Sequence, residues 1–211
     1  LTISLLAVIL CSASIFFYWK MATVRSSPLR LGYQRVTNCA PYWVAAENGF
    51  FNQEGLNVTL IEFSTANRIV EAVAAGRLDM GFSSLLVSAM ALASGIDIRI
   101  ATDGGHTDQD HDGSFIVVAQ NSTMKSIGDL RGKNVAISGW GTATELVLRL
   151  LLKGNNLTMS DVNVAILPLE KQAEALISGR IDAAYLVEPY LTYALERGGF
   201  RKLSATMSAI F

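Results

Sequence analysis

The sequence predicts an α/β protein of two similar lobes, each a mainly parallel sheet flanked by helices, with a ligand cleft between the lobes. A nine-residue pattern occurs twice, as EAVAAGRLD at residues 71–79 and EALISGRID at residues 174–182, and five of its residue types match. The surroundings repeat as well, because strand-like and helix-like runs alternate in each half. Strands joined through helices need crossover connections and pair in parallel, so the two halves are expected to share one topology.

Strand-like runs of the first half are expected to form its sheet. The runs are LRLGYQRV, NVTLIEF and MGFSS, at residues 29–36, 57–63 and 80–84. A further strand, DIRIAT, is expected at residues 97–102. We place lobe 1 at residues 29–113.

Helix ends in the first half are marked by glycine and proline. Pro41 favours the start of a helix that ends at Gly49. Gly76 and Gly95 are expected to end the next two helices, because glycine adopts the left-handed conformation at little cost. The helix of residues 83–95 is nearly free of charge, so we expect it to be buried on most sides.

The second half, placed at residues 114–211, repeats this order. Its expected strands are SFIVVAQ, KNVAIS, NVAILPL and AAYLVEP, at residues 114–120, 133–138, 163–169 and 183–189. SIGDLRGK between the first two predicts a single helical turn. An amphipathic helix is expected from Thr142 or Thr144 to Gly154, and a last helix from Glu188 and Pro189 to Gly198.

Composition bounds the function. The chain has 211 residues, 51% of them hydrophobic, and a net charge of -1, so a globular fold is expected and no basic stripe for nucleic acid exists. Cys11 and Cys39 do not suggest a disulfide framework. Nucleic-acid binding is therefore not predicted.

The N-terminal segment, residues 1–19, carries no charge and would span roughly 28 Å as a helix. It is expected to be an uncleaved membrane anchor or a signal peptide, followed by a linker at residues 20–28. Lys20, Arg25 and Arg30 follow the apolar run, which would favour lobes inside the cytoplasm by the positive-inside tendency. The apolar segment is thus expected to hold an exported protein in the membrane, whereas the basic residues that follow it favour the opposite orientation.

Loops at the carboxyl ends of the strands are the expected ligand site, because helix N-termini there present free N–H groups. The repeat pairs them as residues 38–43 with 138–144, 63–67 with 168–171, and 83–84 with 188–189. These loops are rich in hydroxyl groups. Their one cation is Lys171, and Arg68 follows directly after the loop that ends at residue 67. Such a lining suits a small anion held by helix N-termini, or a neutral polar molecule.

The segment SGWGTAT is the sharpest local signal. Gly139 and Gly141 allow close approach of the backbone, and Thr142 offers a hydroxyl and an N–H at a helix start. An ordinary strand-to-helix turn with a capping threonine explains the segment equally well.

Aromatic and acidic residues of the same loops are further candidates. Tyr42 and Trp140 could stack on a ligand, although aromatic residues in such places also belong to the core or rim. Glu188 could accept hydrogen bonds from a ligand or simply cap a helix.

Metal binding and catalysis receive little support from the sequence. Residues 108–113 spell DxDxDG, the first half of a calcium loop, but its twelfth position is Ala119 rather than a carboxylate. His106 and His111 lie in this same loop, so no catalytic triad or Cys-His pair can be assembled. We expect no metal, no cofactor and no enzyme activity.

The chain resembles the periplasmic solute-binding proteins of ABC importers, of the nitrate, sulfonate, taurine and thiamine-precursor type. The resemblance rests on LRLGY, PYWVAAENGFFNQEGLNV, AVAAGRLDMGFSS, SIGDLRGKNVAISGWGT and ALISGRIDAAYLVEPY, between residues 29 and 203. It implies a two-lobe fold that closes on a small solute and delivers it to a permease and its ATPase, in the periplasm or at the outer face of the cytoplasmic membrane. The ligand contacts it implies are Tyr42, Ser64, Thr65, Ser83, Ser84, Gly141, Thr142 and Glu188.

Departures from this family leave two alternatives open. A return segment that completes the first sheet is expected after residue 205, so the sequence is read as a fragment lacking its C-terminal part, and the leader looks uncleaved. The first alternative is the ligand-sensing ectodomain of a larger membrane receptor. The fold also carries an enzyme that makes the thiamine pyrimidine. That reaction needs an active-site histidine with a nearby cysteine cluster, whereas Cys39 is the one cysteine within the expected lobes.

Overall fold

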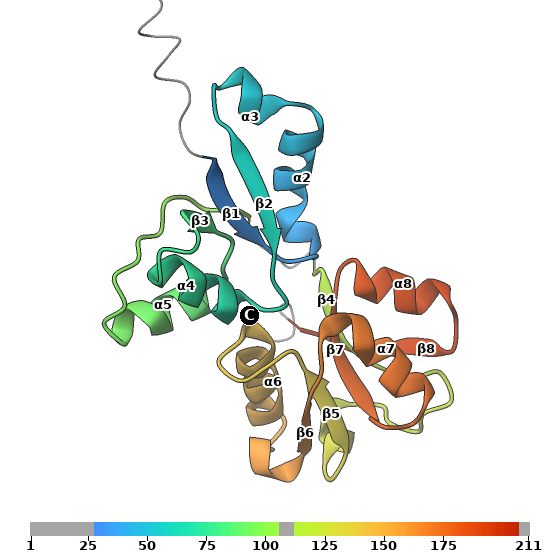
Figure 1. Ribbon diagram of the computed structural model, residues 1–211. Coiled ribbons are helices and arrows are strands. Elements are labelled where there is room, and N and C mark those ends of the chain that lie inside the picture. Colours follow the sequence, from blue (N-terminus) through green and yellow to red (C-terminus); the bar gives the residue numbers. More distant parts are fainter. Residues whose placement is uncertain (1–27, 106–111, 207–211) are drawn as a thin grey trace, which may run out of the picture.

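The computed structural model describes residues 28–105 and 112–206 (Figure 1). The expected anchor at residues 1–19 and the histidines and most of the acidic loop, residues 106–111, lie outside these ranges. Among the described helices, none is both long enough and apolar enough to cross a bilayer. The described residues form two sheets, each with its own helices.

Lobe 1 is built on a parallel sheet of order β2-β1-β3. Its strands are β1 (Leu29–Tyr33), β2 (Val58–Glu62) and β3 (Met80–Gly81). Its helices are η1 (Thr37–Cys39), α2 (Ala40–Glu47), α3 (Phe50–Gln53), α4 (Ala66–Ala74) and α5 (Leu85–Ala93). Pro41 lies in the first turn of α2, and Gly49 follows that helix with a φ of 70°, as predicted.

Lobe 2 is built on a sheet of order β6-β5-β7-β4-β8. Its strands are β4 (Ser114–Ala119), β5 (Asn134–Ile137), β6 (Asn163–Ile166), β7 (Ala183–Val187) and β8 (Phe200–Ala205). Its helices are η2 (Ile127–Leu130), α6 (Ala143–Gly154), η3 (Met159–Asp161), α7 (Leu169–Ile177) and α8 (Tyr190–Glu196). The orders β2-β1-β3 and β6-β5-β7 match, so the duplication extends to topology.

The repeated nine-residue pattern has one structural role in both lobes. The Asp79 carboxylate accepts a hydrogen bond from the Arg30 N–H at 2.8 Å, and the Asp182 carboxylate accepts one from the Asn134 N–H at 2.8 Å. Each aspartate thereby fixes the start of the central strand of its sheet. In lobe 1 the Arg30 side chain also binds Asp79, and these hydrogen bonds lower the pKa of that carboxyl to about 2.

Three expectations about the elements are wrong. Lobe 2 is a mixed sheet, because β4 pairs antiparallel with both β7 and β8. Residues 97–102 form no strand, since the neighbouring β3 pairs over two residues only and offers a short edge. Helix α5 is less buried than expected: Leu85 is 74% exposed. Helix α4 and the segment around Ile96 and Ile98 pack on its buried face.

Both faces of the lobe 2 sheet are covered, which gives this lobe a well-packed core. Alternate residues of β4 point to opposite faces, so Ile116 packs with α6 while Val117 packs with α7 and α8. Figure 1 shows α6 on one side of the sheet and α7 with α8 on the other. The core thereby holds the N-terminal ends of these helices at one edge of the sheet.

Candidate functional site

A cavity of about 310 Å³ lies between the two lobes. All six loops that the sequence repeat pairs contribute to its wall. Lobe 1 supplies Asn38, Thr65 and Ser84, and lobe 2 supplies Ser138, Thr142, Leu169 and Glu188. We refer to this space as the cleft.

Three helices begin at the cleft with a hydroxyl side chain as N-cap. Thr65 caps α4 by accepting from the Arg68 N–H at 3.5 Å, and Ser84 caps α5 by accepting from the Val87 N–H at 3.3 Å. Thr142 caps α6, accepting from the Glu145 N–H at 3.4 Å. Each start carries the positive end of a helix dipole and N–H groups without helical acceptors. The cleft therefore receives positive potential from both lobes.

The loop before α6 is tightly held by its own hydrogen bonds. The Thr142 hydroxyl donates to the Gly139 carbonyl at 2.6 Å and lies 2.7 Å from the Thr144 hydroxyl. Gly141 has a φ of 68°, and its N–H donates to the Glu145 carboxylate at 2.6 Å. The pKa of Glu145 is lowered, first by its bond to Arg149 and further by this N–H. The predicted capping role of Thr142 is confirmed, and the residue lines the cleft.

Four of the predicted site residues line the cleft: Thr65, Ser84, Thr142 and Glu188. The Glu188 carboxylate accepts hydrogen bonds from the N–H and hydroxyl of Thr192 at 3.1 and 3.0 Å, which is the capping arrangement.

The other predicted residues lie elsewhere. Tyr42 and Ser83 line a separate cavity beside β3, where burial raises the pKa of Tyr42. Ser64 lines a third cavity, described below. Neither Trp140 nor Gly141 lines the cleft: Trp140 is 54% exposed, and Gly141 lies against Asn67 and Met90 of lobe 1.

Several cleft residues were not predicted, among them Gln34, Ser114 and Tyr185. The Tyr185 hydroxyl donates to the Ser114 hydroxyl oxygen at 3.2 Å, and burial raises the pKa of this tyrosine. The two residues lie on the neighbouring strands β4 and β7 of lobe 2, and Tyr185 comes three residues after the second copy of the repeat. The sequence could have indicated Tyr185, because it is a polar residue in an otherwise apolar buried strand.

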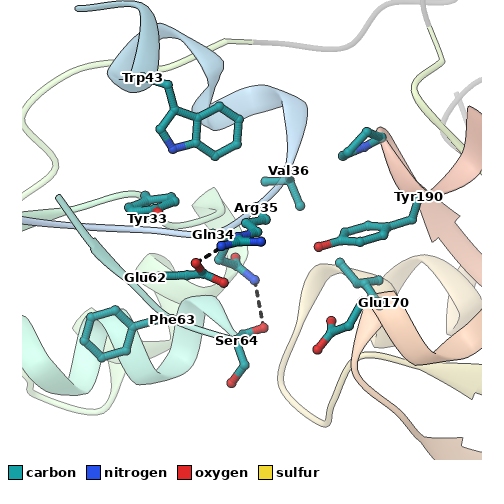
Figure 2. Close-up of a pocket in the computed structure, with 12 residues that line it drawn as sticks. Tyr33, Gln34, Arg35, Val36, Trp43, Glu62, Phe63, Ser64, Glu170 and Tyr190 are labelled. Carbon is teal, nitrogen blue, oxygen red and sulfur yellow. Dashed lines mark hydrogen bonds and ion pairs between the residues drawn. The ribbon is translucent and has the colours of Figure 1, made fainter. Parts of the chain in front are cut away.

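A larger cavity of about 740 Å³ adjoins the cleft and shares Gln34, Val36 and Leu169 with it (Figure 2). We call it the side cavity. Its wall is formed by the ends of β1 and β2 in lobe 1 and the starts of α7 and α8 in lobe 2. Arg35 and Glu62 form an ion pair at 2.8 Å at its centre, and the Gln34 side-chain amide donates to the Ser64 carbonyl at 3.1 Å.

Among the described residues, a few hydrogen bonds join the lobes directly around the cleft, one of them from the Glu188 N–H to the Gly113 carbonyl at 3.0 Å. The Thr37 N–H donates to the Glu188 carbonyl at 3.1 Å, and the Asn67 side-chain amide donates to the Trp140 carbonyl at 3.3 Å. The Asn67 bond brings the first turn of α4 against the loop before α6. Few polar contacts therefore need to change if the lobes move relative to each other.

No group of three His, Cys, Asp or Glu side chains that could hold a metal ion occurs within residues 28–105 and 112–206. Cys39 is fully buried, and burial raises the pKa of its thiol to about 11. The DxDxDG segment and both histidines lie largely or wholly outside the described residues. The site geometry thus rests on hydroxyl groups, N–H groups and helix N-termini.

The sequence was compared with known families and structures. The family described as NMT1/THI5 like matches residues 36–201, most of the two lobes. The chain belongs to the NMT1/THI5-like family. A protein of Escherichia coli strain K12, whose name assigns it to aliphatic sulfonates, is 29% identical over 146 residues, which are 69% of this chain and 44% of that protein. The pyrimidine phosphate synthase of Aspergillus parasiticus is 25% identical over 149 residues, 71% of this chain and 42% of that enzyme.

Solved structures of binding proteins share the fold of this NMT1/THI5-like chain. The periplasmic aliphatic sulphonate binding protein SsuA from Escherichia coli matches with a TM-score of 0.69 and 25% identity, over 85% of this chain and 57% of its own. The periplasmic nitrate-binding protein NrtA from Synechocystis PCC 6803 matches with a TM-score of 0.67 and 15% identity, over 85% and 51%. The predicted family and two-lobe α/β class are confirmed, and the chain spans about half the length of these relatives.

Proposed function

We propose that this protein is the solute-binding component of an ABC importer and captures a small anionic or polar solute between its lobes. The observation that carries the proposal is the convergence of three hydroxyl-capped helix starts, at Thr65, Ser84 and Thr142, on one cleft with walls from both lobes. A solute that touches both walls stabilises the closed arrangement over the open one, which is the requirement for ligand-driven closure.

The chemistry of the cleft favours a solute whose polar end accepts hydrogen bonds. Among the described residues that line it, none is Lys or Arg, and the Glu188 carboxylate is bound to Thr192. A sulfonate or nitrate group would be held by N–H groups, hydroxyls and helix dipoles, each dipole contributing about 0.3–1 kcal/mol. The relatives named for sulfonates and nitrate agree with a solute of this kind. We include taurine and thiamine precursors among the candidate solutes.

Thermal unfolding in the presence of candidate solutes tests the proposal. The set consists of nitrate, alkanesulfonates, taurine and thiamine pyrimidines, with sodium chloride at matched ionic strength as control. A solute at one hundred times its dissociation constant is expected to stabilise the folded state by about 2.7 kcal/mol and to raise the melting temperature. A melting temperature that none of these solutes raises above the chloride control would contradict the proposed function.

The location follows from the same proposal. The protein works outside the cytoplasm, in the periplasm or at the outer face of the cytoplasmic membrane, with residues 1–19 as tether or signal, and its partners are a permease and an ATPase. The relatives named as periplasmic support this location. Protease added to intact spheroplasts is expected to digest tethered lobes, whereas a cleaved protein would appear in the periplasmic fraction. Lobes that resist protease until the membrane is broken would place them inside and contradict import.

The enzymatic alternative is not proposed for this chain. The synthase of Aspergillus parasiticus is a relative, but the described part of the cleft contains neither histidine nor cysteine. Cys39 is fully buried and its pKa is raised, so its thiol stays protonated near neutral pH.

A further inference from the structure

Four aromatic rings line the side cavity. Its rings are Tyr33, Trp43, Phe63 and Tyr190. Tyr33 and Trp43 stand nearly perpendicular, with centroids 5.5 Å apart and an angle of 87° between their planes. Figure 2 shows Tyr190 reaching in from lobe 2, opposite these lobe 1 rings. Tyr33 and Trp43 pack edge to face on each other, and Tyr190 adds a ring from the other lobe. The faces of aromatic rings carry negative electrostatic potential, so this wall offers surface that attracts a cation.

The charged groups of the side cavity leave a negative balance. Arg35 donates to the Glu62 carboxylate at 2.8 Å, so these two charges compensate each other. Glu170, at the start of α7, is exposed and has no ion-pair partner among the described residues. Its carboxylate lies near the Tyr190 ring on the lobe 2 side, as Figure 2 shows. An organic cation there would lie beside aromatic side chains and one free carboxylate, while the Arg35 charge is compensated by Glu62.

From this arrangement we infer that the side cavity binds an organic ammonium group, such as a trimethylammonium. Its walls come from both lobes, and it opens into the cleft at Gln34, Val36 and Leu169. The ammonium group is carried either by a separate molecule or by the solute of the cleft. In the second case, which rests on the proposed function, the solute is a zwitterion whose anionic end lies at the helix starts.

Two matched pairs of variants isolate the aromatic and the acidic contribution. Tyr190→Ala removes a ring of the cavity, and Tyr193→Ala removes an exposed ring one turn further along α8 that is not in its wall. Glu170→Gln removes the free carboxylate, and Glu174→Gln makes the same charge change one turn further along α7, away from the cavity. Because Glu170 is exposed, its variant is expected to fold normally even if Tyr190→Ala does not.

Choline is the test probe, and 3,3-dimethylbutan-1-ol is its neutral analogue of the same shape. In calorimetric or NMR titrations, choline is expected to bind about three- to thirtyfold more tightly than the alcohol, the range given by cation–π energies. Tyr190→Ala and Glu170→Gln should each remove most of this preference, while Tyr193→Ala and Glu174→Gln should keep it. Equal binding of choline and the alcohol, or equal effects of cavity and control variants, would overturn the inference.

A second arm identifies the source of the ammonium group. Propanesulfonate is compared with 3-(trimethylammonio)propanesulfonate, which adds the cation to the same anion. If the zwitterion binds more tightly than propanesulfonate and Glu170→Gln abolishes this difference, both charged groups belong to one solute. If the two compounds bind equally and choline still binds, the anion and the ammonium group belong to two separate ligands. Choline binding that depends on Glu170, without binding of any cleft solute, would support the side cavity and contradict the proposed function.

Discussion

Replacing Ile69 by alanine is expected to lower the free energy of unfolding by about 2–5 kcal/mol, as for other large-to-small changes in a core. Ile69 is 1% exposed and packs with Ala72 and Leu78 beneath the lobe 1 sheet. The strands press closely on it: a Cβ at Gly81 would come within 2.2 Å of the Ile69 Cγ2 atom, and one at Gly32 within 3.1 Å. This side chain therefore fixes how α4, and with it the Thr65 helix start, lies against β1 and β3.

A double-mutant cycle separates this contact from general core packing. Gly81→Ala alone should destabilise by about 1–3 kcal/mol through overpacking. In the Ile69→Ala background its added methyl group has room, so it should cost much less, and chemical denaturation measures the difference. Ile177→Ala, at a position 66% exposed in lobe 2, is the control and should change stability by less than about 0.5 kcal/mol. Strictly additive effects of Ile69→Ala and Gly81→Ala would contradict the packing described.

Thr142→Val is expected to weaken solute binding about fivefold, and up to about 150-fold if the bound group is charged, because it removes a hydroxyl from the cleft wall and keeps the shape. Thr142 is 7% exposed and its hydroxyl also accepts from the Glu145 N–H. The variant should therefore also lose about 1 kcal/mol of stability with the helix cap. Calorimetric titration with the solute found by thermal unfolding measures the affinity.

Thr158→Val is the matched control for this loss of a cap. Thr158 lies at the N-terminus of η3 in lobe 2, where its hydroxyl donates to the Asp161 carboxylate at 2.9 Å, and it lines neither the cleft nor the side cavity. It should lower stability and leave the affinity unchanged. If Thr142→Val binds the solute as tightly as Thr158→Val does, Thr142 is a helix cap alone and has no part in binding.

Repetition made much of the fold predictable from the sequence. The glycines after α4 and α7 have φ values of 66° and 69°, and Asp79 and Asp182 bind equivalent strands, as two copies of one local pattern should. The helix start at Thr142 was also predictable, since a strand followed by Thr and a helix is a local signal.

Features that depend on distant partners were not predictable. The antiparallel pairing of β4 with β7 and β8 is set by how the chain returns to the sheet, and β8 shows no pattern that distinguishes its direction. Tyr42 and Ser83 stand in the expected loops but face another cavity, because loop position does not fix the direction of a side chain. Gln34, just after β1, and Tyr185, in the middle of β7, line the cleft although neither belongs to a local binding motif.

Amide NMR spectra of the protein titrated with propanesulfonate, nitrate or a solute from the thermal screen test the central proposal most directly, because they locate binding residue by residue. The account predicts saturable shifts for N–H groups in the first turns of α4 and α5 in lobe 1 and of α6 in lobe 2, all with one dissociation constant. Shifts confined to one lobe, or saturation that leaves these three helix starts unchanged, would contradict capture of the solute between the lobes.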